Sequence, residues 1–330
     1  MNQVNTKKQK TSEKILDIIS KKGRISANEL SEILEISPRA IFKQLARLIL
    51  DNKIDKIGRP PKVFYFIKKE KIAEDKINLD NKTKKIIEEN YLIITPSGKR
   101  KSGIEGFVYW CNKNKLPIEK TAQEYIETFK KYEKFKKNSL ISGMTKIKNT
   151  FKKTALKNLF YLDFYSIERF GKTKLGQLLL YAKQSQDKKL MKELIDIIRP
   201  QINEIIIQYK IDGVGFIPPT VKRENQFMKF LENNLHLQTR LVKISKARTD
   251  IMVPQKTLNK LEDRIDNAKK TIIVEDRLQY NNILLIDDAV GSGATLNETA
   301  TQIKESGITK NIIGLAITGS FKGFDVISEV

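Results

Sequence analysis

The sequence predicts an α/β protein with a doubly wound, mostly parallel sheet, preceded by a small helical module with a hairpin and by a helical connector. Four consecutive apolar residues, Ile283 to Ile286, are typical of a strand buried on both faces, as in a parallel sheet. Strand-like and helix-like segments alternate around that run. A set of capped helical segments precedes them, between residues 12 and 49. We expect domains at residues 1–68, 69–154 and 155–330.

Length and composition limit the classes of protein. The 330 residues, 40% of them hydrophobic, allow two to three folded domains. No apolar run approaches the roughly 20 residues of a membrane span, and the segment from Met1 to Lys10 is polar, so we expect a cytoplasmic protein without a membrane partner. Cys111 and His236 are the single cysteine and histidine. The sequence therefore predicts no disulfide framework, no metal site made by protein ligands alone and no histidine-based nucleophilic triad.

The positive charge is concentrated in the front part of the chain. Residues 1–212 carry all but about +2 of the net charge of +23. Such an excess favours a polyanionic partner. It is mostly lysine in a chain that is also rich in isoleucine and asparagine, so a biased genome composition would produce it equally well.

Residues 12–68 carry helix signals in close succession. The apolar face of a first helix consists of Ile15, Leu16, Ile18 and Ile19. This helix ends before Gly23, and Ser26 caps a second one. Ser37 caps a third helix, with Pro38 in its first turn. The spacing predicts three short helices with tight turns.

Two strands follow, at residues 53–57 and 63–67, joined by a basic hairpin at residues 58–61. Together with the three helices, this segment resembles a winged helix-turn-helix domain. The resemblance implies that the third helix faces a DNA major groove and that the wing contacts phosphate or the minor groove. The residues implied are Arg39, Lys43, Gln44 and Arg47 in the helix, and Arg59 and Lys62 in the wing. The alternative is a module for protein contacts, with these charges merely solvated.

Residues 69–154 are rich in lysine and show no motif with a chemical function. Helical periodicity at residues 122–135 and a strand-like run at residues 91–94 favour a basic helical connector. Its aromatic residues could stack on bases, although aromatic residues at this spacing more often form a core. They are Phe107, Tyr109, Trp110 and Tyr125.

From about residue 155, the pattern predicts alternating elements typical of a doubly wound sheet. A helix begins near residue 155. The further elements are a strand at 214–217, a helix at 227–235, a strand at 239–244, a mobile basic stretch, the strand at 283–286, a helix at 296–304 and a strand at 312–318.

A polar run follows the strand Ile283 to Ile286. It reads Asp287-Asp288-Ala289-Val290-Gly291-Ser292-Gly293-Ala294-Thr295. Ligands of parallel sheets bind at the carboxyl ends of strands, where paired carboxylates can accept hydrogen bonds from ribose hydroxyls. Backbone N–H groups of the glycine loop can close around a phosphate at the start of the next helix. The alternative is a glycine-rich turn of no chemical use.

This run resembles the loop that binds 5-phosphoribosyl diphosphate (PRPP) in type I phosphoribosyltransferases. Further matches narrow the resemblance to the ComF-like branch: Pro218-Pro219, Arg223-Glu224-Asn225-Gln226, and Gln255-Lys256-Thr257-Leu258 followed by Arg264 and Asn267. The resemblance implies the type I phosphoribosyltransferase fold, Mg²⁺ bound together with PRPP, and a flexible loop that closes over the diphosphate. The residues implied at the diphosphate are Pro218, Pro219, Lys256, Lys260 and Arg264.

The sequence leaves three functions open. We expect a homodimeric transcriptional regulator in which PRPP or a related nucleotide changes the DNA affinity of the winged domain. The alternative is an active phosphoribosyltransferase that transfers the phosphoribosyl group to an unknown acceptor. A third alternative is a back half that binds nothing and serves as a dimerisation body.

Overall fold

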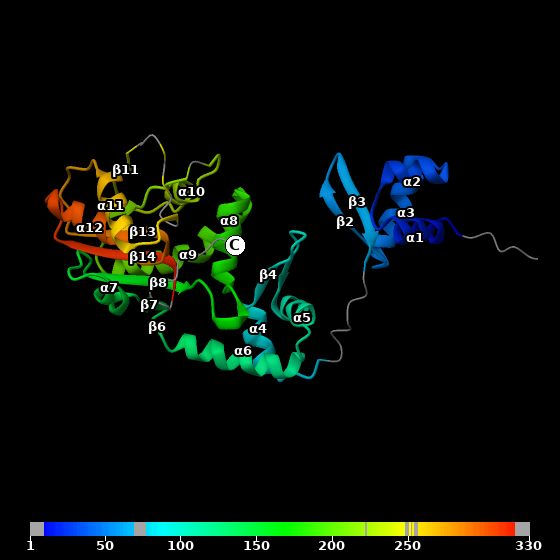
Figure 1. Ribbon diagram of the computed structural model, residues 1–330, viewed down its shortest axis with the longest axis horizontal. Helices are drawn as coiled ribbons and strands as arrows, with labels where there is room; N and C mark the ends of the chain where they lie inside the picture. The colour runs from blue at the N-terminus through cyan, green and yellow to red at the C-terminus, as the bar shows by residue number, and fades with distance from the viewer. Residues whose placement is uncertain are drawn as a thin grey trace, which may run out of the picture. The chain divides into compact units, whose positions relative to one another are not determined.

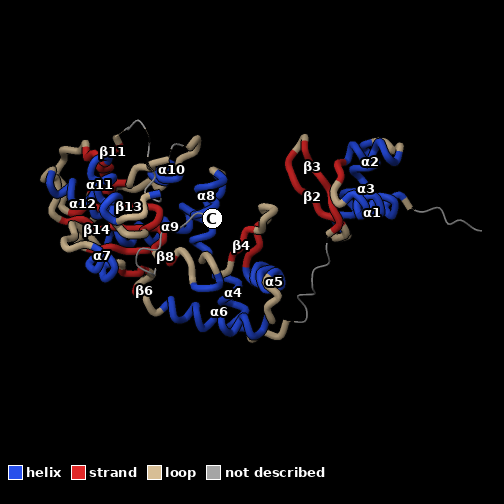
Figure 2. Tube along the Cα trace, viewed as in Figure 1, coloured by secondary structure: helices blue, strands red, loops and turns tan. Residues whose placement is uncertain are grey.

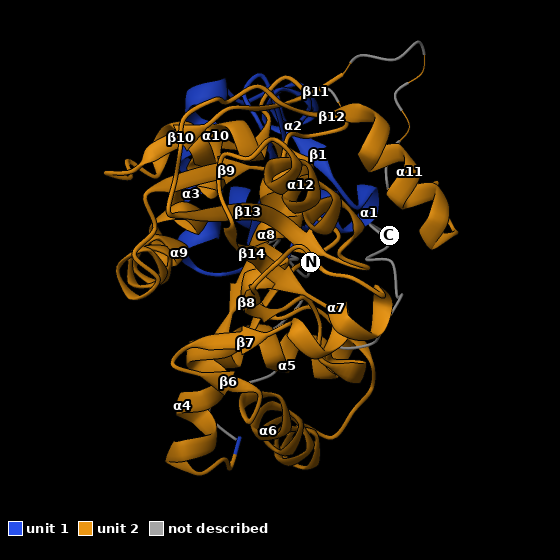
Figure 3. Cartoon of the chain, turned by 90° about the vertical axis from the view of Figure 1, so that its left-hand side faces the viewer, with its two compact units in different colours: residues 1–77 blue, residues 78–330 orange. Residues whose placement is uncertain are grey.

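The computed structural model describes residues 10–68, 77–221, 223–247, 251, 253 and 257–320. The chain divides into two compact units, residues 1–77 and 78–330 (Figure 3). Each unit contains its own cluster of buried apolar side chains. Across the described residues, every helix is too short or too polar to cross a membrane.

The first unit consists, in its described residues, of helices packed on a small antiparallel sheet with strand order β1-β3-β2. Its elements are α1 (Thr11–Lys22), β1 (Ile25–Ser26), α2 (Ala27–Leu34), α3 (Pro38–Leu50), β2 (Ile54–Arg59) and β3 (Lys62–Ile67) (Figure 1). The buried core includes Ile15, Ile19, Leu30, Ile41, Leu45, Leu48 and Ile54. The β2–β3 hairpin is longer than predicted because Arg59 pairs with Lys62, which leaves Pro60 and Pro61 as the turn.

Capping contacts between residues close in the chain explain why the sequence predicts where these helices begin. The Ser26 side chain accepts a hydrogen bond from the Glu29 N–H at 3.2 Å, and the Glu29 carboxylate accepts one from the Ser26 N–H at 2.8 Å. This reciprocal pair satisfies N–H groups that a helix start leaves without partners. At the start of α3, the Ser37 side chain accepts a hydrogen bond from the Ala40 N–H, without a reciprocal bond, and Pro38 is the first helical residue.

The second unit begins with helices around a short hairpin, which Figure 2 shows in blue and red. The elements are α4 (Asn81–Asn90), β4 (Leu92–Ile94), β5 (Arg100–Ser102), α5 (Gly103–Lys113) and α6 (Ile118–Glu133). Phe107 and Tyr125 are buried, and their ring centroids lie 5.5 Å apart. Cys111 is fully buried, and burial raises the pKa of its thiol to about 12. Phe107 and Tyr125 therefore belong to a core rather than to a stacking surface for bases, whereas Tyr109 and Trp110 are half-buried.

A mostly parallel sheet forms the centre of the second unit. In the described part of the chain it has seven strands, in the order β10-β9-β13-β14-β8-β7-β6. These are β6 (Lys136–Lys137), β7 (Leu140–Ser142), β8 (Asn158–Phe164), β9 (Gly213–Phe216), β10 (Arg240–Val242), β13 (Asn282–Val290) and β14 (Asn311–Gly319). β10, β9, β13, β14 and β8 pair in parallel, whereas β7 and β6 are antiparallel. Two strands, β6 and β7, come from the segment that the sequence predicts to be a helical connector.

Helices cover both faces of this sheet (Figure 1). α8 (Lys174–Ser185), α9 (Lys188–Gln208) and α10 (Phe227–Asn234) bury their apolar side chains together on one face. α12 (Ala294–Glu305) lies on the other face, with α11 (Leu261–Thr271) beside it and α7 (Met144–Thr150) nearby. A two-stranded antiparallel sheet of β11 (Ile244–Lys246) and β12 (Ile272–Val274) completes this layer.

One element predicted near residue 155 is wrong. The chain there forms the strand β8 rather than a helix, and the first α-helix after it is α8. β8 lies between β14 and β7 in the sheet and has nearly continuous apolar residues, among them Leu159, Leu162 and Phe164. Such a short apolar run fits a buried strand and a buried helical segment equally well, and its place in the middle of the sheet decides between them.

Candidate functional site

A cavity of about 270 Å³ opens at the carboxyl ends of β9 and β13. β9 and β13 are neighbours in the sheet, but the chain continues from β9 to β10 on one side and from β13 to β14 on the other. The helices that follow them, α10 and α12, lie on opposite faces. The strand order therefore reverses at this point, and ligands of open α/β sheets bind in the crevice at such a reversal.

Asp287 and Asp288 lie in the second half of β13 and line this cavity. The strand extends beyond the acids, further than the sequence predicts, because β14 provides partners as far as Gly319, opposite Val290. Successive side chains of a strand point to opposite faces. The two carboxylates therefore meet different layers of the unit, one on the α8 face and one on the β11 face.

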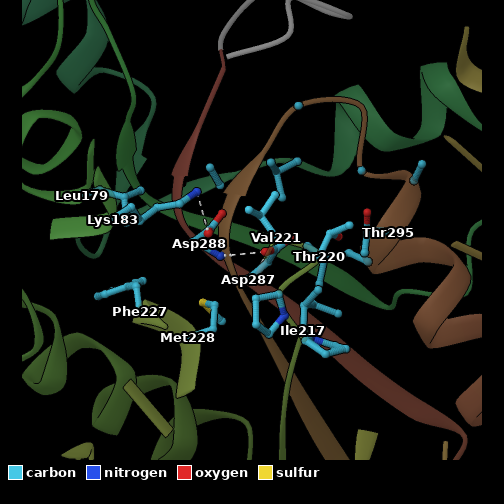
Figure 4. A pocket seen from close by; sticks show the side chains of 18 of the residues that line it. Leu179, Lys183, Ile217, Thr220, Val221, Phe227, Met228, Asp287, Asp288 and Thr295 are labelled. Atoms are coloured by element: carbon cyan, nitrogen blue, oxygen red, sulfur yellow. Dashed lines mark hydrogen bonds and ion pairs between the residues drawn. The ribbon is translucent and has the colours of Figure 1, made fainter. Parts of the chain in front are cut away.

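Each layer brings a lysine towards the acid pair. Lys183 of α8 forms an ion pair with Asp288, with Nζ 2.8 Å from Oδ2, and both side chains are largely buried (Figure 4). Lys246 of β11 donates a hydrogen bond to Thr220 Oγ1 at 2.7 Å. Burial lowers the pKa of Lys246, and the charge of Asp287 opposes this shift. The sequence alone did not identify Lys183 or Lys246 as site residues, since neither belongs to a recognisable motif.

The electrostatics of the two acids differ. Burial, and next the negative charge of Asp288, raise the pKa of Asp287 to about 8. Asp287 accepts a hydrogen bond from the Asp288 N–H at 2.8 Å, which opposes the shift. At neutral pH the Asp287 carboxyl is therefore largely protonated and can donate a hydrogen bond, whereas Asp288 forms the ion pair with Lys183.

The segment from Gly291 to Thr295 consists of the turn between β13 and α12 and the first two residues of α12, and it lines the same cavity. Gly293 adopts a left-handed conformation, with φ of +83°, immediately before the helix. Ala294 N–H donates to Ser292 Oγ at 3.3 Å. The first N–H groups of a helix lack intrahelical partners and carry its positive dipole end. This turn therefore presents donors suited to an anion.

Buried Asn297 holds the first turn of α12 in place. Its Oδ1 accepts hydrogen bonds from Thr154 Oγ1 and from the Ala155 N–H, both at 3.0 Å. Since residues 154 and 155 lead into β8, the helix start is connected to the strand on the far side of β14. The loop is thus held from two sides.

The predicted diphosphate residues are only partly brought together. Pro218 and Pro219 follow β9 and line the cavity, as does Arg264, whose Nε donates to the Leu258 carbonyl at 2.7 Å. Lys260 is exposed and does not belong to the cavity lining. Lys256 lies outside the described residues. The other wall is apolar and includes Leu179, Phe227 and Met228 (Figure 4).

In the first unit, most predicted DNA-contacting side chains are free of the core. Arg39, Lys43 and Arg47 are exposed on α3, whereas Gln44 is half-buried. Arg59 and Lys62 are exposed and face each other across the tip of the β2–β3 hairpin. Five of the six predicted residues, all of them cations, are thus exposed to the solvent.

Residues 8–55 match the family model described as winged helix-turn-helix DNA-binding. The chain therefore carries a DNA-binding winged helix-turn-helix domain at its front. The prediction of this domain is confirmed, and α1, α2 and α3 are its helices. No curated protein matches the chain. Among the described residues, no group of three or more His, Cys, Asp or Glu side chains is placed to hold a metal ion.

Proposed function

We propose that this protein is a transcriptional regulator in which PRPP or a related nucleotide, bound in the α/β unit, changes the DNA affinity of the winged helix-turn-helix domain. The observation that carries the proposal is the combination, in one cavity, of the acids Asp287 and Asp288 with the loop Gly291 to Thr295. Carboxylates suit ribose hydroxyls, and a helix start suits a phosphate. The winged domain provides the DNA-binding part.

The ligand's charges have counterparts around the acid pair. The diphosphate would be attracted by three cations, Lys183, Lys246 and Arg264. The acid pair would accept hydrogen bonds from the ribose hydroxyls. Mg²⁺ prefers oxygen ligands and usually binds through one or two carboxylates plus phosphate oxygens, so Asp287 and Asp288 suit an ion that enters with PRPP. A ribose hydroxyl reaching Asp288 would compete with Lys183 for its carboxylate.

The first experiment is isothermal titration of PRPP with Mg²⁺ into the full-length protein and into Asp288→Asn. We expect the variant to bind roughly ten- to a hundredfold more weakly, the usual loss for a hydrogen bond to a charged group. Asp266→Asn is the matched control, because this acid forms an exposed ion pair with Lys270 on α11. Equal affinity of all three proteins would remove the acid pair from the proposed site.

Reciprocal linkage tests the regulatory part. If PRPP changes the DNA affinity of the winged domain by some factor, DNA must change the PRPP affinity by the same factor. We expect the two measured factors to agree. Identical PRPP affinities for free and DNA-bound protein would contradict regulation while leaving PRPP binding intact. Light scattering on the same samples tests the homodimer that we propose as the active form, because dimers of such domains bind paired half-sites.

The second candidate function is catalysis by the same cavity. Nearby lysines favour it, since they could neutralise a departing diphosphate. In that reaction an acceptor nitrogen forms a bond to C1 of PRPP, and the bond from C1 to the diphosphate oxygen breaks with its electron pair, releasing pyrophosphate. Pyrophosphate release with any added base, lost in Asp288→Asn, would favour the enzyme over the sensor.

A further inference from the structure

An apolar line of side chains lies on the exposed face of α3, among its basic residues. Phe42 is 51% exposed and Leu50 is 81% exposed, and exposed Ala46 lies between them. Residues four positions apart share one side of a helix. The opposite side of α3 supplies Ile41, Leu45 and Leu48 to the core. Phe42 is therefore not needed to close the core of the domain.

The neighbours of Phe42 indicate what kind of partner covers it. Arg39 precedes it by three residues and Lys43 follows it directly, and both are exposed. Cations beside an apolar ring favour a polyanion that also carries apolar groups. The match to a DNA-binding family makes that polyanion DNA. In the major groove, the apolar group that the bases present is the C5-methyl group of thymine.

We propose that Phe42 packs against thymine methyl groups in the major groove, so that the DNA site of this protein contains thymine at the position facing the second turn of α3. The N-terminal residues of a recognition helix contact base edges. Phe42 lies close to the start of α3 at Pro38, whereas Leu50 is its last residue. The inference rests on the DNA-binding part of the proposed function and is independent of the ligand in the α/β unit.

The test begins with selection of duplexes from a random pool by the full-length protein, with and without PRPP and Mg²⁺. Each thymine of the selected site is then replaced by uracil, which removes the methyl group and keeps the base pairing. We expect one or two replacements to weaken binding about fourfold, the effect of one buried methyl group. In Phe42→Ala the same replacements should have no effect.

Ile33→Ala is the matched control, because Ile33 is 46% exposed on α2 rather than on the recognition helix. It should keep the wild-type response to uracil. The proposal would be overturned if no uracil replacement weakened binding of the wild-type protein. It would also be overturned if the replacements weakened binding of Phe42→Ala as much as they weaken binding of the wild type. A third result would also overturn it: Phe42→Ala has an altered oligomeric state but its binding is still weakened by the uracil replacements. Phe42 would then contact a second copy of the chain. If no duplex is selected under either condition, DNA binding itself fails, which differs from the loss of thymine recognition alone.

Discussion

The winged domain and the α/β unit assemble their functional side chains in different ways. In the winged domain, the exposed cations predicted to contact DNA come from one helix, α3, and one hairpin tip. In the α/β unit, the cavity gathers side chains from α8, from the segment after β9, from α11 and from β13, separated by up to about a hundred residues. The DNA-facing side chains of the winged domain do not pack in its core, whereas the cavity side chains of the α/β unit pack between the sheet and its helices. Substitutions should therefore separate binding from stability in the winged domain and couple them in the cavity.

The largest expected effect comes from the core that supports the winged surface. Leu45→Ala should destabilise the winged domain by about 2–5 kcal/mol, because it removes a fully buried side chain and leaves a cavity. Hydrogen exchange of α1 to α3 and DNA binding measure the effect. Leu50→Ala in the same helix is the control, since Leu50 is 81% exposed and should leave stability nearly unchanged. Equal effects of the two variants would show that the surface and core of α3 are not separate.

In the cavity, Lys183→Met should lower the free energy of unfolding by about 1–3 kcal/mol. It leaves the largely buried carboxylate of Asp288 without the ammonium group 2.8 Å away. Chemical denaturation of the full-length protein, followed by a probe in the α/β unit, measures this. Lys270→Met is the control, because its ion pair with Asp266 is exposed and such pairs contribute little. A loss of PRPP affinity without any loss of stability would contradict the expected coupling.

The acid pair also predicts how stability depends on pH. The pKa of Asp287 is raised from its ordinary value of 3.8 to about 8, so between these values the folded protein holds a proton that the unfolded chain releases. The free energy of unfolding should therefore fall as pH rises through this range. Asp287→Asn should reduce this fall and stabilise the protein by about 1–2 kcal/mol at pH 8. Urea midpoints measured across the range test this, with Asp266→Asn as the control. An identical pH profile for wild type and Asp287→Asn would contradict the assignment.

The smallest effect on stability is expected at the DNA-facing cations. Arg47→Ala should change the free energy of unfolding by less than about 0.5 kcal/mol, since the side chain is exposed. If Arg47 contacts phosphate, the slope of DNA affinity against salt should fall by about one. Lys21→Ala is the control, because Lys21 lies on α1, outside the recognition helix α3 and the β2–β3 hairpin. An unchanged salt slope in Arg47→Ala would remove this residue from the interface.

Local chemistry in the sequence determined the helices of the winged domain and the polar loop of the α/β unit. Ser26, Ser37 and Gly23 mark helix ends by contacts within a few residues, so the pattern contains all the information that these boundaries need. The run before Asp287 likewise predicts a buried strand, although not its length. The match of residues 8–55 to a DNA-binding family confirms the first of these predictions.

Tertiary structure alone decided the strand order, the presence of β8 and the partners of the acid pair. β8 was missed because a short apolar run does not by itself distinguish a buried strand from a buried helical segment, and only its place between β14 and β7 decides. Lys183 reaches Asp288 because α8 packs on one face of the sheet, and Lys246 approaches from the other face through β11. Contacts between residues far apart in the chain depend on how elements stack, and stacking follows from the summed burial of whole faces rather than from any short motif.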